Sequence, residues 1–207
     1  ITTASYRIVA RSIEEVNHFI ARHHNVVLKA PLSGSGKGIR FVSDQLSHSD
    51  NGWCRNLISR HGCVIVEQRL TILQEFAMLF RCIGGNVEFC GYSLFYSHNG
   101  AYRGNILASN LYIEGKLSRF IPLEVLMESR RLLTSFLKSE VAGKYDGFVG
   151  VDQFYSEEMG FNPVVEMNIR MTMGLLARNI YDCFPCAGDG THCFEINRQK
   201  VDGQIKY

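Results

Sequence analysis

The stretch "NPVVEMNIRMTMG", residues 162–174, combines a strand-like alternation with three chemically different polar side chains. Alternation along a strand places Glu166, Asn168 and Arg170 on one face and Val165 and Met167 on the other. A carboxylate, an amide and a guanidinium would then point into one space. The alternative is an exposed strand face that forms ordinary surface ion pairs. That alternative explains neither the apolar opposite face nor the asparagine between two charged residues.

A further carboxylate, Asp152, lies in the preceding strand candidate "GFVGVDQFY", residues 147–155. Mg²⁺ prefers oxygen ligands and is commonly bound by one or two carboxylates together with nucleotide phosphates. Asp152, Glu166 and Asn168 therefore predict a site for Mg²⁺, with Mn²⁺ as the alternative metal. Arg170 follows two residues later and is predicted to stabilise charge on a transferring phosphoryl group.

A second signal for phosphate lies in "VVLKAPLSGSGKGIRFV", residues 26–42, where Lys29 ends an apolar run and a Gly/Ser segment follows. A Walker P-loop is excluded because Pro31 replaces its first glycine and Gly38 replaces the Ser or Thr after the lysine. A strand, a glycine-rich loop and a second strand instead predict a flap. Its backbone N–H groups would contact phosphate oxygens, with Lys29 beside them. The alternative is a flexible surface loop whose lysine snorkels into solvent.

The segment "VIVEQRL", residues 64–70, is an apolar strand that runs into Glu67. This pattern suits a hinge whose backbone groups read an adenine edge while a later carboxylate holds the ribose hydroxyls. Gln74 and Glu75 are the candidates for the ribose contact. Taken alone, the segment is better explained as an ordinary strand that ends in a solvated charge.

The periodicity along the chain predicts an α+β fold with two lobes, residues 1–115 and 116–207. Helices are expected at 12–23, 53–61, 122–141 and 171–184, with Ser47 to Gly52 as a polar, helix-breaking stretch. Strands are expected at 26–30, 39–42, 63–70, 74–82, 87–97, 102–108, 146–155 and 163–170.

The composition is that of an ordinary globular protein, with 46% apolar and 20% charged residues among 207. A net charge of +2 gives no reason to expect a nucleic-acid partner or a polybasic membrane anchor, and the apolar runs are too short to cross a bilayer. Seven scattered cysteines favour a reducing, cytoplasmic location over a disulfide framework. Because the first residue is Ile1, we interpret the sequence as a piece of a longer protein.

Taken in order, the four elements resemble the ATP-grasp superfamily over roughly residues 10–175. They are a strand with a lysine, a glycine-rich flap, an apolar strand ending in Glu, and an Asp followed by Glu-x-Asn. "VEMNIR", residues 165–170, is similar to the Glu-Met-Asn-x-Arg motif of the biotin carboxylase and carbamoyl-phosphate synthetase branches. The resemblance implies a nucleotide held between two α+β lobes.

The resemblance also assigns roles to residues. Glu75 would bind the ribose, Arg170 and Lys29 would act in catalysis, and Asp152, Glu166 and Asn168 would bind the metal. The phosphates would contact Lys29, Ser33, Gly34, Ser35, Gly36, Lys37 and Gly38, and the adenine would face Glu67, Gln68, Arg69 and Leu70.

The activity implied is that of an ATP- and Mg²⁺-dependent ligase, which phosphorylates a small-molecule carboxylate and passes the acylphosphate to an amine or a thiol. The alternatives are a nucleotide-binding regulatory module without catalysis and an ATP-dependent phosphotransferase. The sequence departs from the family pattern at Gly150, where members that ligate amino acids often carry an arginine. The usual N-terminal domain is expected upstream of this piece.

Overall fold

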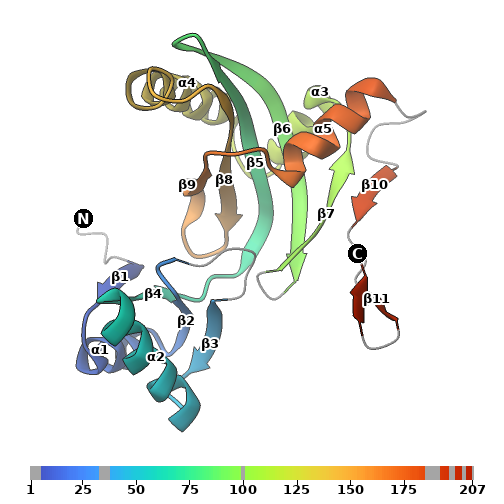
Figure 1. The fold of residues 1–207 in the computed structure, drawn as a ribbon. Helices are drawn as coiled ribbons and strands as arrows, with labels where there is room; N and C mark the ends of the chain where they lie inside the picture. Colours follow the sequence, from blue (N-terminus) through green and yellow to red (C-terminus); the bar gives the residue numbers. More distant parts are fainter. Residues whose placement is uncertain are drawn as a thin grey trace. The chain divides into compact units, whose positions relative to one another are not determined.

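A computed structural model describes residues 6–32, 38–98, 101–184, 192–195, 199–201 and 204–206 (Figure 1). Its contacts divide the chain into two compact units, Ile1–Leu70 and Thr71–Tyr207. Both units combine helices with antiparallel sheets, which confirms the predicted α+β class.

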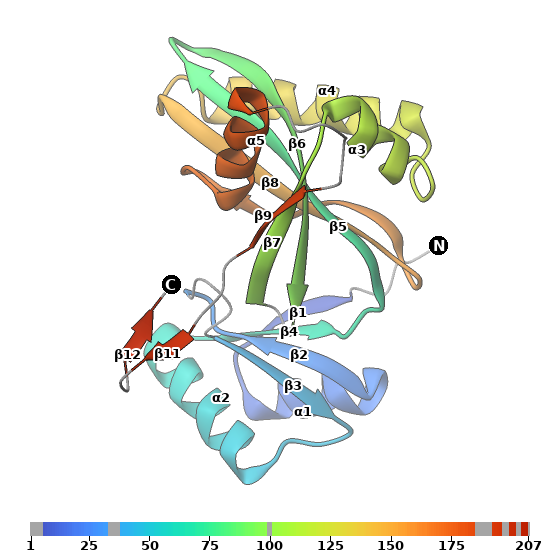
Figure 2. The same cartoon turned by 90° about the vertical axis from the view of Figure 1, so that its right-hand side faces the viewer.

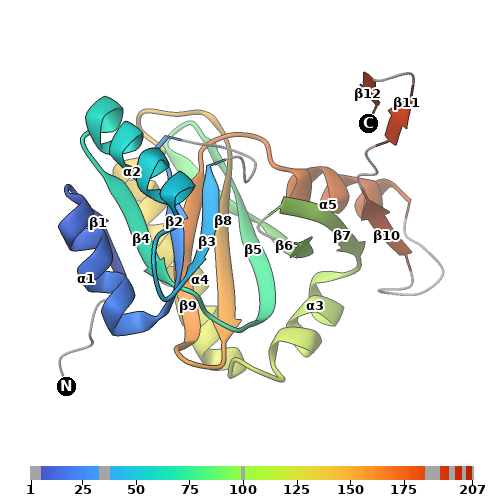
Figure 3. The same ribbon diagram turned by 90° about the horizontal axis from the view of Figure 1, so that it is seen from below.

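The first unit is a four-stranded antiparallel sheet packed against two helices (Figure 3). Its strand order is β1-β4-β2-β3, and its elements are β1 (Arg7–Ala10), α1 (Ile13–His23), β2 (Asn25–Lys29), β3 (Ile39–Ser43), α2 (His48–His61) and β4 (Val64–Gln68). Alternate strand residues such as Val26, Leu28 and Val66 are fully buried against the apolar face of α1. The strands bury every second residue, and the helix buries residues spaced about 3.6 apart, so both apolar faces form one core.

The helix expected at 53–61 begins earlier, at His48. Ser47 is its N-cap: the Ser47 hydroxyl accepts from the backbone N–H of Asp50, and the Asp50 carboxylate accepts from the backbone N–H of Ser47. This capping box makes the polar stretch a helix start instead of a helix breaker, so that part of the prediction was wrong. Strand β1 was also not predicted.

The second unit is built on a six-stranded antiparallel sheet with the order β10-β7-β6-β5-β8-β9 (Figure 2). Its strands are β5 (Ile72–Ile83), β6 (Asn86–His98), β7 (Ala101–Leu107), β8 (Gly147–Ser156), β9 (Gly160–Asn168) and β10 (His192–Glu195). Its helices are α3 (Asn110–Leu117), α4 (Leu123–Glu140) and α5 (Met173–Cys183), and β11 (Gln199–Val201) pairs with β12 (Gln204–Lys206). Among the described residues, no helix has the length and apolar character needed to cross a membrane.

Helices cover both faces of this sheet. Leu126, Leu133 and Leu137 of α4 share a buried cluster with Val149 and Val151 of β8. On the opposite face, Leu175 of α5 packs with Ala77 and Leu79 of β5. Because side chains alternate along β8, Asp152 belongs to the face that α5 covers.

The predicted boundary between residues 115 and 116 lies inside α3, whereas the contacts divide the chain after Leu70. The physical reason is strand β5, whose Phe76 pairs with Leu94 of β6 on one side and with Gln153 of β8 on the other. Residues 72–107 therefore share one hydrogen-bonded sheet with the strands that follow α4.

Candidate functional site

The structure brings together the four polar residues predicted near the C-terminus. Asp152 on β8 and Glu166 on β9 are register partners, so the two residues lie directly opposite each other on neighbouring strands. The amide Nδ2 of Asn168 donates to Oδ2 of Asp152 at 3.0 Å, and Nη2 of Arg170 donates to Oδ1 of Asn168 at 2.8 Å. Strand β9 ends at Asn168, so Arg170 lies just beyond the strand and reaches back through its long side chain.

Burial and negative charge act together on Asp152. Its pKa is raised from 3.8 to about 7, chiefly because burial disfavours the carboxylate and then because of the charge of Glu166. The hydrogen bond from Asn168 and the charge of Arg170 oppose this rise without cancelling it. Two facing carboxylates that repel each other at neutral pH are the arrangement that a divalent cation stabilises.

Glu75 is a third carboxylate in this cluster. On β5, Ala77 pairs with Asp152, and Glu75 lies two residues away on the same face. Its charge contributes to the raised pKa of Asp152, and its Oε2 accepts a hydrogen bond from the hydroxyl of Ser97. The sequence identified Glu75 as a candidate residue but did not predict that it lies near Asp152. Only the strand order β5-β8-β9 shows that proximity.

The oxygen-rich chemistry of these side chains fits Mg²⁺. Among the described residues, no group of three or more His, Cys, Asp and Glu side chains is arranged to hold a metal ion unaided. The amide oxygen of Asn168 and the oxygens of a ligand would have to complete the coordination. That amide oxygen accepts one hydrogen bond from Arg170, which leaves its second lone pair for a metal ion.

Gly150 has a packing role beside this cluster. A Cβ atom at position 150 would lie 2.9 Å from Cγ2 of Thr172, closer than two carbon atoms normally approach. Thr172 is the N-cap of α5, where its hydroxyl accepts from the backbone N–H of Leu175 at 3.3 Å. The glycine thus lets the start of α5 lie on the sheet, which explains why an arginine is absent at this position.

In the first unit, Lys29 forms an ion pair with Glu67 on the adjacent strand β4, instead of extending freely into solvent. The Glu67 side chain is 13% exposed and also lies 3.7 Å from Nη1 of Arg7 on β1. Arg7 was not found by sequence reasoning, since β1 was not predicted. The backbone N–H of Ala30 donates to the carbonyl of Gly38 at 2.8 Å and closes the base of the glycine-rich loop. The five predicted phosphate contacts from Ser33 to Lys37 lie outside the described residues.

The segment predicted to face adenine has several of its polar groups engaged within the first unit. The backbone N–H groups of Gln68 and Arg69 donate to the carbonyls of Tyr6 and Asn25, at 2.8 and 2.9 Å. The Arg69 guanidinium lies over the ring of Phe41, 5.0 Å from its centre. These contacts limit the backbone donors that the segment offers to an adenine edge.

Comparison of the sequence finds no matching family model and no matching curated protein. Comparison of the structure does find similar proteins. An N5-carboxyaminoimidazole synthetase from Staphylococcus aureus, complexed with ADP, is 16% identical over 80% of this chain with a TM-score of 0.57. A biotin carboxylase from Campylobacter jejuni, complexed with β,γ-ATP, is 15% identical over 83% of this chain with a TM-score of 0.58. The chain has the ATP-grasp fold.

A third ATP-grasp structure is the biotin carboxylase domain of 2-oxoglutarate carboxylase from Hydrogenobacter thermophilus, complexed with MgADP, ADP and bicarbonate. It is 17% identical over 79% of this chain, with a TM-score of 0.54. This chain spans 40%, 37% and 35% of the lengths of the three ATP-grasp proteins.

Proposed function

We propose that the chain is the ATP-grasp domain of an ATP- and Mg²⁺-dependent ligase that joins a carboxylate to an amine or a thiol through an acylphosphate. One observation carries the proposal: strand pairing and two hydrogen bonds bring Asp152, Glu166, Asn168 and Arg170 together at one face of the sheet. Support comes from the similar structures, which were solved with ADP, β,γ-ATP or MgADP. Small-molecule substrates and a cytoplasmic location are part of the proposal.

The proposal gives each polar group a task. Asp152, Glu166 and Asn168 would hold Mg²⁺, which would neutralise charge on the phosphate oxygens. Arg170 would stabilise the charge that spreads over the transferring phosphoryl group. Lys29 would bind phosphate oxygens through its ammonium, and the residues up to Gly38 would bind them through backbone N–H groups.

The reaction requires positioning more than covalent help from the protein. A carboxylate oxygen of the substrate attacks the γ-phosphorus of ATP, and the bond to the bridging oxygen of ADP breaks. An amine or a thiol then attacks the carbonyl carbon of the acylphosphate, and inorganic phosphate leaves.

Two other functions use the same nucleotide site. A regulatory module would bind the nucleotide without turnover, and a phosphotransferase would release a stable phosphorylated product. Asp152 and Glu166 lie opposite each other, and Arg170 donates to the neighbouring Asn168. A cation this close to two carboxylates favours a catalytic site over a regulatory module. Product analysis distinguishes the second, because a ligase yields ADP, phosphate and an amide or thioester, whereas a phosphotransferase yields ADP and the phosphorylated acceptor.

Thermal unfolding with Mg-ATP, with ATP and EDTA, and with Mg-GTP tests the nucleotide site directly. A ligand at about a hundred times its Kd stabilises the folded state by about 2.7 kcal/mol, which raises Tm by several degrees. We expect a rise that needs both ATP and Mg²⁺ and disappears in Glu166→Gln. The control is Glu140→Gln, an exposed residue at the end of α4. Equal rises with and without EDTA would contradict the metal assignment.

A further inference from the structure

A hydrogen bond between strands β5 and β6 extends the carboxylate cluster sideways across the sheet. The hydroxyl of Ser97 on β6 donates to Oε2 of Glu75 on β5. Glu75 lies two residues from Ala77 and therefore on the same face, the one that bears Asp152. Ala77 also pairs with Ser93 of β6, and Ser97 lies four residues further along that strand, so it shares this face. Glu75 and Ser97 are half-buried, so a ligand can reach them.

The direction of this hydrogen bond determines what the pair offers to a ligand. An ionised carboxylate has only acceptor oxygens, so Ser97 donates its single hydroxyl proton to Glu75. Within the part of the chain that the structure describes, Oε1 of Glu75 receives no hydrogen bond, and the Ser97 oxygen keeps its lone pairs. All of these remaining sites are acceptors. Two neighbouring acceptors match a ligand that presents two neighbouring donors, as the hydroxyls of a vicinal diol do.

The polar side chains next to Ser97 have partners of their own. Ser97 pairs with Tyr102 of β7, beside a bulge in the β6–β7 ladder, and bulges are common where a side chain is re-aimed next to a functional site. The Tyr102 hydroxyl donates to Oδ1 of Asn105, which is fully buried. Nδ2 of Asn105 in turn donates to the hydroxyl of Ser93. Because Tyr102 is engaged with Asn105, it leaves the Ser97 hydroxyl to Glu75.

The pair lies close enough to the proposed Mg²⁺ site for one nucleotide to reach both. Ala77 pairs with Asp152, and Glu75 is two residues, about 7 Å, away from Ala77 along β5. In a nucleotide the ribose carries the vicinal diol and is joined through C5′ to the phosphates. A pair of acceptors beside carboxylates that hold Mg²⁺ and phosphate therefore suits a ribose.

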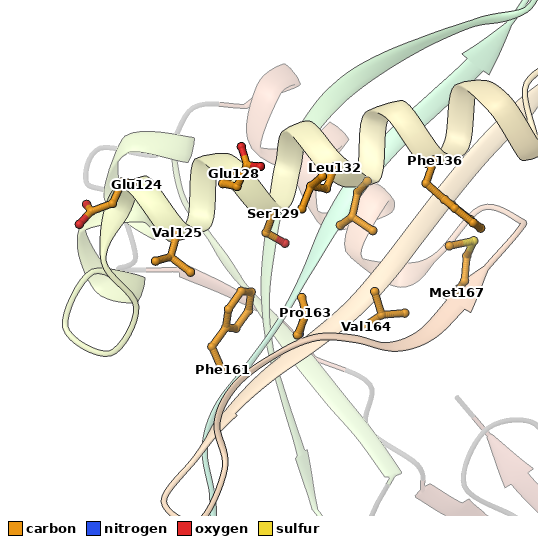
Figure 4. Close-up of a pocket in the computed structure, with 11 residues that line it drawn as sticks. Glu124, Val125, Glu128, Ser129, Leu132, Phe136, Phe161, Pro163, Val164 and Met167 are labelled. Atoms are coloured by element: carbon orange, nitrogen blue, oxygen red, sulfur yellow. The ribbon is translucent and has the colours of Figure 1, made fainter. Parts of the chain in front are cut away.

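The opposite face of the sheet has a different character. A groove of about 710 Å³ lies there between α4 and β9, and its lining is mainly apolar, with Leu132, Phe136 and Val164 among the residues (Figure 4). Glu124, an exposed residue of α4, lies at one end of this groove (Figure 4). Since Glu124 is on the other side of the sheet from Glu75, it provides a matched control for the experiment.

We propose that Ser97 is a positioning and specificity residue for the nucleotide, a step that rests on the proposed function. Ser97 holds the Glu75 carboxylate, and the two side chains together accept the 2′- and 3′-hydroxyls of the ribose. One hydroxyl donates to Oε1 of Glu75 and the other to the Ser97 oxygen. The pair selects a ribonucleotide over a deoxynucleotide, because a missing hydroxyl leaves one acceptor without its donor.

Titration calorimetry with the magnesium complexes of ATP, 2′-deoxy-ATP and 3′-deoxy-ATP tests this role. We expect the wild type to bind ATP about threefold to tenfold more tightly than either deoxynucleotide, the range of one hydrogen bond. Ser97→Ala should weaken ATP by a similar factor but leave one deoxynucleotide nearly unchanged, the one that lacks the hydroxyl accepted by Ser97. Ser97→Thr keeps a hydroxyl and should restore the affinity for ATP.

Glu75→Gln should also weaken ATP, because it removes the carboxylate that both Ser97 and the ribose contact. The matched controls are Glu124→Gln and Ser135→Ala, two exposed residues of α4, which should bind all three nucleotides like the wild type. Thermal unfolding without nucleotide checks that each variant is folded. Ser97→Cys, which nearly keeps the shape and weakens the donor, replaces Ser97→Ala if the alanine variant unfolds.

Equal binding of the three nucleotides by the wild type would overturn the role of Ser97 and leave the proposed function standing. The same holds if Ser97→Ala weakens all three nucleotides alike, since that is the result of a purely structural role. A wild type that binds none of the three would instead refute the proposed function, and the ribose contact with it.

Discussion

Replacing Asp152 with asparagine should stabilise the metal-free chain at neutral pH. In the folded state the pKa of this carboxyl rises from 3.8 to about 7, because of burial first and the charge of Glu166 second. A raised carboxyl pKa means that the folded state holds its proton more tightly than the unfolded state. Stability is therefore lost as pH increases from about 4 to about 7, and it stays low above that.

The magnitude follows from the rise itself. Each pKa unit corresponds to about 1.4 kcal/mol, so a rise from 3.8 to about 7 corresponds to roughly 4 kcal/mol of unfolding free energy. Asp152 is partly exposed, and solvent screening reduces this figure, so we expect a gain of about 2–4 kcal/mol for Asp152→Asn at pH 7.5. The asparagine retains an oxygen to accept the hydrogen bond from Asn168.

Urea denaturation in EDTA at pH 5 and pH 7.5 measures the effect. The wild type should lose stability between the two values relative to Asp152→Asn, and the exposed control Glu140→Gln should follow the wild type. With Mg-ATP at pH 7.5 the advantage of the variant should shrink, because a bound cation stabilises the carboxylate that the variant lacks. Parallel stability profiles of wild type and Asp152→Asn in EDTA would refute the raised pKa of Asp152 in the folded state.

Three further changes test other parts of the structure. Lys29→Met removes one of the two cations paired with the largely buried Glu67 carboxylate and leaves Arg7. We expect the free energy of unfolding in urea to fall by about 1–3 kcal/mol and calorimetry to show weaker Mg-ATP binding. Unchanged Mg-ATP binding would exclude Lys29 from the phosphate site. Gly150→Ala places a Cβ 2.9 Å from Thr172 and should destabilise by about 1–3 kcal/mol, whereas a gain in stability would mean that α5 can shift. Ser47→Ala removes the capping box of α2 and should cost about 1 kcal/mol; no loss would show that packing alone sets the helix start.

Local patterns predicted the elements whose signals lie in adjacent residues. Helix α1 carries Ser12 as its N-cap and buries Ile13, Val16 and Ile20 at helical spacing, and the structure places it within one residue of the prediction. Helix α2 was predicted too short because Ser47 and Asp50 were weighed as helix breakers, although the same residue types cap helices when they are three apart. Helix α3 was missed because its eight residues include Gly115 and only two, Ile113 and Leu117, are buried.

The spatial neighbourhood of the site required the topology. Sequence alternation was sufficient to place Glu166 and Asn168 on one face, because both lie on the same strand. It did not bring Glu75 to Asp152, because the chain between them forms two strands and two helices before β8 returns beside β5. Long-range strand order is not encoded in any local pattern, so the sequence predicted a ribose contact for Glu75 but not its place beside Asp152.

The sheet of the second unit explains how the fold is retained at 15–16% identity with TM-scores of 0.57 and 0.58. Most of its positions require only an apolar side chain of suitable volume, as at Met78, Val149 and Val151, and many sequences meet that requirement. The proposed function requires particular side chains only at the few residues that face Asp152. Met167 connects the two kinds of position. It packs beneath α4 on one face of β9, while its neighbours Glu166 and Asn168 belong to the carboxylate cluster on the other face. Substitutions there should alter the cluster through the position of β9, without removing any charged group from it.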